Sequence, residues 1–284
     1  MRDMFGSDLH AKRVLSLANG VVGIMNAAAA SIHAIGQGLA AATGGDAKHT
    51  TKQVDRLLSN RKVDVWGLFE HWVPFVLAKR KDIVTALDWT EFDKDDQSTI
   101  ALHLITGHGR STPLMWRTVR KSELKGMRTQ HEDELIDRFH EIVPDDVRVM
   151  VLADRGFGDQ LRYQHLEVLG WEFVIRFRQN ILVGGRDGHT APAKDWLHPS
   201  GRARMIRGAK VTAAQTPVPA IVCVHAKGMK DGWYLATSRD DLKASEVVKL
   251  YSKRFTIEEG FRDTKDLRFG LGLSATRILK DPLI

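Results

Sequence analysis

Residues 83–90 read Ile83-Val84-Thr85-Ala86-Leu87-Asp88-Trp89-Thr90 and begin a regular alternation of strands and helices. The β-branched and apolar side chains of this stretch predict a β-strand. Asp88 is a charged residue within it, and a carboxylate is costly to bury unless it has a partner. We therefore expect Asp88 to lie in a strand and to face a cation. The alternative is a turn residue.

The residues that follow predict a meander of three strands and then alternating helices and strands. A Gly-His-Gly turn (107–109) separates the second and third strands, and Gly170 ends the second helix. The predicted elements are strands at 99–106 and 113–120, a helix at 132–142, a strand at 147–153, a helix at 160–169 and a strand at 171–177. A long helix from Ser245 closes this β-β-β-α-β-α-β series. This is the order of the α/β ribonuclease H-like fold, whose mixed sheet places the first and fourth strands side by side.

Two regions lie outside this core. Residues 1–78 predict helices, among them a basic-faced helix at Thr50–Leu58 and one at Trp66–Leu77 that Pro74 kinks or breaks. Residues 181–237 carry turns and alternating runs, and they predict a β-rich insertion before the last helix. We therefore divide the chain into a helical region at 1–78, the first part of the core at 79–180, the basic insertion at 181–237, and the catalytic helix with the C-terminal end at 238–284.

The net charge of +7 indicates an anionic partner. Residues 175–230 hold ten basic and two acidic side chains, so this stretch has a net charge of +8 and the rest of the chain is close to neutral. Such a concentration of positive charge is typical of nucleic-acid binding; the alternative is a basic β-region without a ligand. Trp196 and Trp233 are candidates to stack on a flipped base, although core packing is the more frequent fate of tryptophan.

Several classes of protein are excluded. Cys223 is the only cysteine, which rules out a disulfide framework and a cysteine-based zinc site within one chain. No signal peptide is apparent. The uncharged segment Val21–Thr43 is mostly Ala and Gly with polar interruptions, so we expect a buried helix or helical hairpin there and no membrane span. The single cysteine and the lack of an apparent signal peptide lead us to expect a protein of the reducing cytoplasm.

Four residues near the C-terminus share one face of the predicted helix: Tyr251, Arg254, Glu258 and Lys265. Their spacing of three, four and seven residues places them within an arc of about 60° and along about 21 Å. A carboxylate binds a metal, and cations and a phenol at fixed distances from it hold phosphates. The face therefore predicts an enzyme that cuts a DNA backbone. The alternative is a surface helix with ordinary charge pairs.

Metal-dependent cleavage of DNA needs two or three carboxylates that converge. Asp154 ends the fourth predicted strand, next to Asp88, and the last helix would bring Glu258 over both. Asp154 could instead cap a helix, but Asp159 suits that role better. Glu259 competes with Glu258 but points about 100° away from the shared face.

The pattern Y-x2-R-x3-E-x6-K resembles the signature of bacterial insertion-sequence transposases of the YREK group (insertion sequence 4 type), a branch of the DDE transposases. The segments around Asp88 and Asp154, and the stretch from Ile257 to Ser274, are also similar to that family. The resemblance implies Asp88, Asp154 and Glu258 as the acidic triad that binds two Mg²⁺ ions, with Mn²⁺ as a substitute. It further implies that Tyr251 and Arg254 hold a terminal phosphate, that Lys265 contacts the DNA backbone and that Arg176 contacts DNA.

The resemblance implies cut-and-paste DNA transposition in the bacterial cytoplasm, in association with the nucleoid. The partners would be double-stranded transposon ends and target DNA, bound by a homodimer; excision through a hairpin and excision by another pathway both stay open. Thr50–Leu58 is the candidate for contact with the ends, and a helical cap on the core is the alternative.

Two other functions stay open. One is a catalytically inactive, transposase-derived DNA-binding protein, and the other is a different ribonuclease H-like nuclease. Only nineteen residues follow Lys265, whereas the resembled transposases usually continue with further helices, so truncation of the chain is also an expectation.

Overall fold

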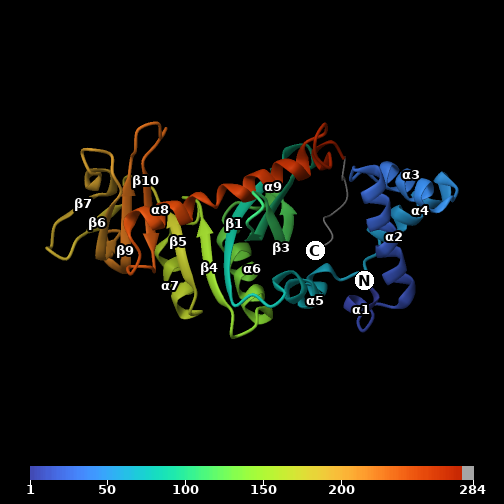
Figure 1. Cartoon of the computed structure of the whole chain (residues 1–284), viewed down its shortest axis with the longest axis horizontal. Helices are drawn as coiled ribbons and strands as arrows, with labels where there is room; N and C mark the ends of the chain where they lie inside the picture. Colours follow the sequence, from blue (N-terminus) through green and yellow to red (C-terminus); the bar gives the residue numbers. More distant parts are fainter. Residues whose placement is uncertain (277–284) are drawn as a thin grey trace.

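The computed structural model describes residues 1–276. N-terminal helices gather at one end of an elongated molecule, a sheet runs along the rest, and the other end consists mainly of strands (Figure 1). The helices are α1 (Arg2–Phe5), α2 (Ala11–Ala27), α3 (Ile32–Thr43), α4 (Ala47–Leu58), α5 (Val65–Leu77), α6 (Arg128–Ile142), α7 (Gln160–Val168), α8 (Ala244–Ser252) and α9 (Phe255–Lys265). The strands are β1 (Asp82–Phe92), β2 (Gln97–Ile105), β3 (Ser111–Arg120), β4 (Arg148–Ala153), β5 (Glu172–Arg176), β6 (Leu182–Gly184), β7 (Thr190–Pro192), β8 (Arg204–Val211), β9 (Thr216–Val224) and β10 (Trp233–Thr237).

The strands form one mixed sheet in the order β3-β2-β1-β4-β5-β10-β9-β8-β6-β7. Strand β1 pairs antiparallel with β2 and parallel with β4, and β4 pairs parallel with β5. This half of the sheet is consistent with the ribonuclease H-like order predicted above. The insertion is β-rich, as predicted. Its strand β10 pairs antiparallel with β5, so the insertion extends the same sheet.

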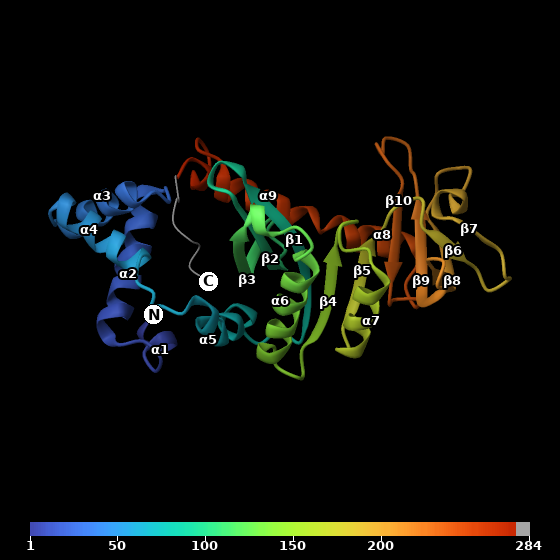
Figure 2. The ribbon, with the colours of Figure 1, turned by 180° about the vertical axis from the view of Figure 1, so that it is seen from behind.

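The alternation of side chains along β4 divides the core into two layers. Val151 faces the layer that contains α6 and α7, whereas Met150 and Leu152 pack with residues of α8. The two views show α6 and α7 on one face of the sheet and α8 and α9 on the other (Figures 1 and 2). Asp154 continues the Met150–Leu152 alternation, so its side chain belongs to the face that α8 and α9 cover.

The long helix predicted from Ser245 is wrong in one respect, because it is broken between α8 and α9. At the break the backbone bonds span three residues: the Arg254 N–H donates to the Tyr251 carbonyl, and the Ile257 N–H donates to the Arg254 carbonyl. Residues three apart eclipse one another in such a 3₁₀ turn. Tyr251, Arg254 and Ile257 are accordingly all buried, while Glu258 is turned further outward. Contrary to the sequence prediction, the four side chains therefore do not lie along one continuous helix.

The N-terminal helices begin and end at recognisable signals. The uncharged segment is two helices, because Ala28 adopts a left-handed conformation after α2 and Ser31 caps α3. Asp46 caps α4, and α5 continues through Pro74, so the proline does not break it. Among the described residues no single helix is long and apolar enough to cross a membrane; α2 and α3 pass such a test only as a pair, bent by 93°.

Candidate active site

The two predicted aspartates lie side by side where β1 and β4 run together. Leu87 of β1 is in register with Ala153 of the parallel strand β4, and each aspartate is the next residue along the chain. The charge of Asp154 is close enough to raise the pKa of Asp88. The carboxyl end of a parallel strand is the usual site position in open α/β sheets.

The turn after β4 fastens Asp154 in place. The Gly156 N–H donates to Asp154 Oδ1 at 2.7 Å, and Phe157 is buried in the core. A Cβ atom on Gly158 would lie 2.6 Å from the Arg176 carbonyl oxygen, so only glycine allows this turn to approach the end of β5 so closely. Asp159, as predicted, caps α7 instead of Asp154.

Arg254 bridges two of the three predicted carboxylates. Its guanidinium donates to Asp88 Oδ2 at 2.9 Å and to Glu258 Oε1 at 2.5 Å. The Arg254 side chain is only 6% exposed, compared with 17% for Asp88 and 51% for Glu258. The cation that we predicted as a partner of Asp88 is therefore Arg254, and through it the helix α9 brings Glu258 to the aspartates.

The electrostatics of Asp88 follow from this crowding. The pKa of Asp88 is raised to about 6, chiefly by burial; Arg254 lowers it, and the negative charges of Asp154 and Glu258 contribute to the rise. The Trp89 backbone N–H also donates to Asp88 Oδ1 at 2.9 Å. A concentration of carboxylates that opposes ionisation in this way favours the binding of a cation.

Tyr251 lies beneath the surface, next to the same charges. Its ring packs edge-on against Trp233, with 5.0 Å between the centroids, and it is almost fully buried. Arg254 and Arg176 lie close enough to lower the pKa of the phenol, which burial raises. Arg176 donates to the Gly232 carbonyl at 3.1 Å, and its buried Nε has no partner among the described residues.

Lys265 is turned towards the end of β1. Its ammonium donates to the Glu91 carbonyl at 2.6 Å and lies 4.8 Å from the centroid of the Phe92 ring. An open groove of about 650 Å³ runs past these groups, and its walls include Asp88, Glu258 and Lys265. The structure thus brings Asp88, Asp154, Glu258, Arg254, Tyr251 and Arg176 together at one place, with Lys265 further along the groove.

The donor set fits a divalent cation in its chemistry. Three carboxylates are the oxygen ligands that Mg²⁺ prefers, and the raised pKa of Asp88 reflects its burial first and the neighbouring negative charges of Asp154 and Glu258 second. Arg254 stands between Asp88 and Glu258, and within residues 1–276 no three acidic, His or Cys side chains are grouped closely enough to hold a metal as they stand.

The two tryptophans proposed for base stacking differ in placement. Trp196 is buried, and its ring packs against His189 and Arg204. This explains Trp196 as a core residue and removes it as a stacking surface. Trp233 is half-buried and contacts Tyr251 and Phe255 beside the candidate active site.

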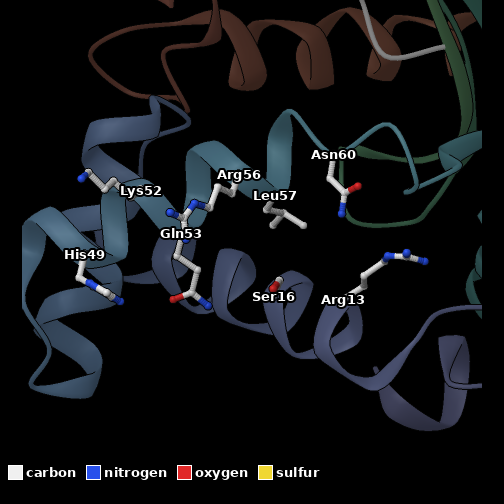
Figure 3. A pocket seen from close by; sticks show the side chains of 8 residues that line it. All are labelled: Arg13, Ser16, His49, Lys52, Gln53, Arg56, Leu57 and Asn60. Carbon is white, nitrogen blue, oxygen red and sulfur yellow. The ribbon is translucent and has the colours of Figure 1, made fainter.

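A second basic site lies among the N-terminal helices. A pocket of about 390 Å³ separates α2 from α4, and Figure 3 shows Lys52 and Arg56 of α4 on the side opposite Arg13 of α2. The pocket is lined by Arg13, Ser16, His49, Lys52, Gln53, Arg56, Leu57 and Asn60, none of which is acidic. The pocket suits an anion. Sequence reasoning found its α4 side but missed Arg13, because the pairing of α2 with α4 is a tertiary contact.

Sequence reasoning also missed two polar residues beneath α9. His103 of β2 and Ser111 of β3 are buried and hydrogen-bonded to each other at 2.9 Å. The signal that could have indicated them is Gly260, which is unfavourable within a helix unless a close contact requires it.

The model of the transposase DDE domain family matches residues 79–278, which is more than half of the chain and includes every predicted site residue. Proteins of this family are polynucleotidyl transferases that cleave and join DNA in transposition, generally with divalent metal. A search of curated proteins found no match. By its match over residues 79–278, which include the core strands, the insertion and helices α8 and α9, the chain belongs to the transposase DDE domain family.

Proposed function

We propose that this protein is a transposase of the YREK group, of the insertion sequence 4 type, that cleaves DNA at the ends of its own element and transfers those ends to target DNA. The observation that carries the proposal is the bridge from Arg254 to Asp88 and Glu258, with Asp154 beside Asp88. An ordinary ribonuclease H-like nuclease would not require this arginine, nor Tyr251 and Lys265 at their spacing from Glu258.

Asp88, Asp154 and Glu258 are the residues that would hold divalent metal. Two Mg²⁺ ions, or Mn²⁺ in their place, supply activation of the attacking oxygen and stabilisation of the leaving oxygen. The remaining residues act on the DNA itself. Arg254 has the fork of donors that suits a phosphate, so a terminal phosphate can replace the carboxylates as its partner. The resemblance implies that Tyr251 holds the same phosphate, but its side chain is buried, with its ring centroid 5.9 Å from the Arg254 guanidinium. Tyr251 would therefore position Arg254, while Lys265 and Arg176 provide positive charge along the DNA path.

The pocket between α2 and α4 extends this proposal to the N-terminal region. Its lining of Arg13, Lys52, Arg56 and His49 is suited to a DNA backbone, and we assign it contact with the transposon ends. A homodimer that pairs two such ends would act on the DNA in the bacterial cytoplasm.

The test of the proposal is Mg²⁺-dependent cleavage of a duplex that carries the inverted repeat flanking the gene. We expect a nick at the repeat boundary and a loss of about a hundredfold in rate for Glu258→Ala, the size typical of removing one group that stabilises a transition state. The matched control is Glu259→Ala, which removes the same charge from the next residue of α9, where Glu259 pairs with Arg262. The control should cleave at the wild-type rate.

Three results would contradict the proposal. If Glu258→Ala cleaved at the wild-type rate, Glu258 would have no role in catalysis. Cleavage without preference for the repeat would favour another nuclease. Specific binding without cleavage by the wild type would favour a catalytically inactive DNA-binding protein.

The N-terminal pocket gives a separate prediction. Arg56→Gln should weaken binding to the repeat duplex and should reduce by about one the slope of log affinity against log salt, since one phosphate contact is lost. Fluorescence anisotropy at several salt concentrations measures this slope. Lys48→Gln is the control, because Lys48 is exposed on the same helix but does not line the pocket. An equal change of slope in both variants would show that the pocket has no special role.

A further inference from the structure

The helix α9 rests on the β2–β3 hairpin through a chain of polar contacts. The Ser111 hydroxyl donates to the Thr256 carbonyl at 3.2 Å, in the first turn of α9, and His103 Nδ1 lies 2.9 Å from the same hydroxyl oxygen. His103 is only 5% exposed, and its ring meets the Phe261 ring edge-on at 5.3 Å. No residue predicted from the sequence to act in catalysis takes part in this chain.

The donors and acceptors of these two hydrogen bonds can be assigned because the Ser111 hydroxyl has a single proton. The Ser111 hydroxyl has one proton and gives it to the Thr256 carbonyl, so it can only accept from His103. His103 Nδ1 therefore carries a proton and donates it. Burial lowers the pKa of His103 to about 4, so the ring is neutral at pH 7. Of its two neutral tautomers, only the one with the proton on Nδ1 can donate to Ser111.

Gly260 allows α9 to come close enough for these contacts. A Cβ atom at this position would lie 3.3 Å from the Ser111 hydroxyl oxygen and 3.6 Å from His103 Nδ1. Glycine within a helix costs about 1 kcal/mol relative to alanine, and the close approach gives a reason for it here. On the outer side, Arg110 donates to Asp263 at 2.5 Å, so the hairpin holds α9 at a second point.

The hydrogen bonds from His103 to Ser111 and from Ser111 to Thr256, here called the anchor of α9, lie where the helix is interrupted between α8 and α9. The 3₁₀ turn between α8 and α9 leaves the first turn of α9 without support from a continuous α-helix. Thr256 precedes Glu258 by two residues in that turn, and Glu258 is half exposed. The hydrogen bond from Ser111 to the Thr256 carbonyl is thus a contact from the sheet that bears on where Glu258 stands relative to Asp88, beside the bridge through Arg254.

We propose that His103 and Ser111 are positioning residues, which hold the first turn of α9 and so keep Glu258 on the side of Asp88, from where it can act as a metal ligand. This inference rests on the proposed function, since it assigns Glu258 a role as a metal ligand. The pair does not touch DNA or metal; it acts through the backbone of α9.

The test compares Ser111→Ala with a matched control and a conservative variant. Ser98→Ala is the control, because Ser98 is a fully buried serine of the same hairpin whose hydroxyl has no hydrogen-bond partner among the described residues. Ser111→Thr keeps the hydroxyl. We expect Ser111→Ala to lower kcat for repeat cleavage about tenfold with KM unchanged, since small displacements of catalytic groups have effects of this size or larger. Ser98→Ala and Ser111→Thr should stay near the wild-type kcat.

A second measurement does not depend on cleavage. Mn²⁺ binding, followed by the loss of the free-ion electron spin resonance signal, should weaken about tenfold in Ser111→Ala, within the range seen when groups that orient metal ligands are removed. It should not change in Ser98→Ala. His103→Leu should behave as Ser111→Ala does, because the hydroxyl then loses its donor.

The outcomes separate the two proposals. Wild-type protein that binds Mn²⁺ but does not cleave would contradict the proposed function alone, and the Mn²⁺ affinities of the variants would still test the anchor. Equal kcat and equal Mn²⁺ affinity in Ser111→Ala and Ser98→Ala would overturn the positioning role. So would a failure of Ser111→Thr to restore either quantity, or a rise in KM that accounts for the whole effect.

Discussion

Replacing Asp88 by asparagine should lower the rate of Mg²⁺-dependent cleavage about a thousandfold and leave the fold intact. Asp88 accepts from Arg254 through Oδ2 and from the Trp89 N–H through Oδ1. Asparagine has nearly the same shape and keeps one acceptor oxygen, so it retains one of these two hydrogen bonds. It loses the charge that would bind metal. Because metal ions supply several kcal/mol of transition-state stabilisation and each 1.36 kcal/mol is tenfold in rate, a loss of about 4 kcal/mol corresponds to about a thousandfold.

The measurement is single-turnover cleavage of the repeat duplex, with the melting temperature recorded for each protein. Asp82→Asn is the matched control, since it makes the same change at the exposed start of β1, where Asp82 pairs with Arg148. The control should retain wild-type activity. If Asp88→Asn kept more than a tenth of the wild-type cleavage rate, Asp88 would not be a catalytic residue.

Arg254→Met should reduce the free energy of unfolding by about 3–5 kcal/mol at pH 7.5 without divalent metal. Removing one member of a buried ion pair leaves its partner uncompensated, and losses of this size are typical. Asp88 would then stand in a buried place with Glu258 and Asp154 near it and no cation between them. Millimolar Mg²⁺ should recover part of the loss, since a ligand that binds only the folded state stabilises it.

The sign of the pH dependence follows from the pKa of Asp88. That pKa is raised to about 6 in the folded protein from 3.8, so the folded state holds the proton more tightly than the unfolded chain does. A group of this kind favours folding at low pH, and the benefit is lost as pH rises through the folded pKa. Arg254 lowers the pKa of Asp88, so its removal moves that loss to higher pH. The destabilisation by Arg254→Met should therefore be smaller at pH 5 than at pH 7.5.

Chemical denaturation at the two pH values, with and without Mg²⁺, measures these differences. Arg262→Met is the control on the same helix, where the side chain is 64% exposed and pairs with Glu259. It should change stability by less than about 1 kcal/mol, because exposed ion pairs contribute little. Equal losses in both variants, or a loss with Arg254→Met that grows at pH 5, would contradict the role given to Arg254.

Much of the sheet could be predicted from local patterns. Three patterns are each formed by neighbouring residues: the alternation around Asp88, the Gly-His-Gly turn and the apolar run before Asp154. Hydrophobic periods of two and 3.6 residues can be recognised in such a segment without knowing what it packs against. The same holds for the cap at Asp159, which depends on the first turn of α7 alone. The requirement that Asp88 face a cation also follows from burial in a strand.

The break between α8 and α9 could not be predicted in this way. The residues from Tyr251 to Ile257 have no proline or glycine to mark it, and the 3₁₀ turn exists because Tyr251, Arg254 and Ile257 are all drawn into the protein interior. The burial of Trp196 is similar, since it depends on how the short strands of the insertion fold over its ring.

The sequence by itself determined most of the order of strands and helices, and it singled out Asp88, Asp154 and Glu258 as the candidate acids, because these rest on residue type and local spacing. Only the tertiary structure decided which cation faces Asp88, that Ser111 holds α9, and that α2 and α4 form a basic pocket. The physical reason is distance along the chain: Arg254 lies 166 residues from Asp88, and Thr256 lies 145 residues from Ser111. Contacts of that separation exist only once the sheet has brought its strands together and α9 has packed across them.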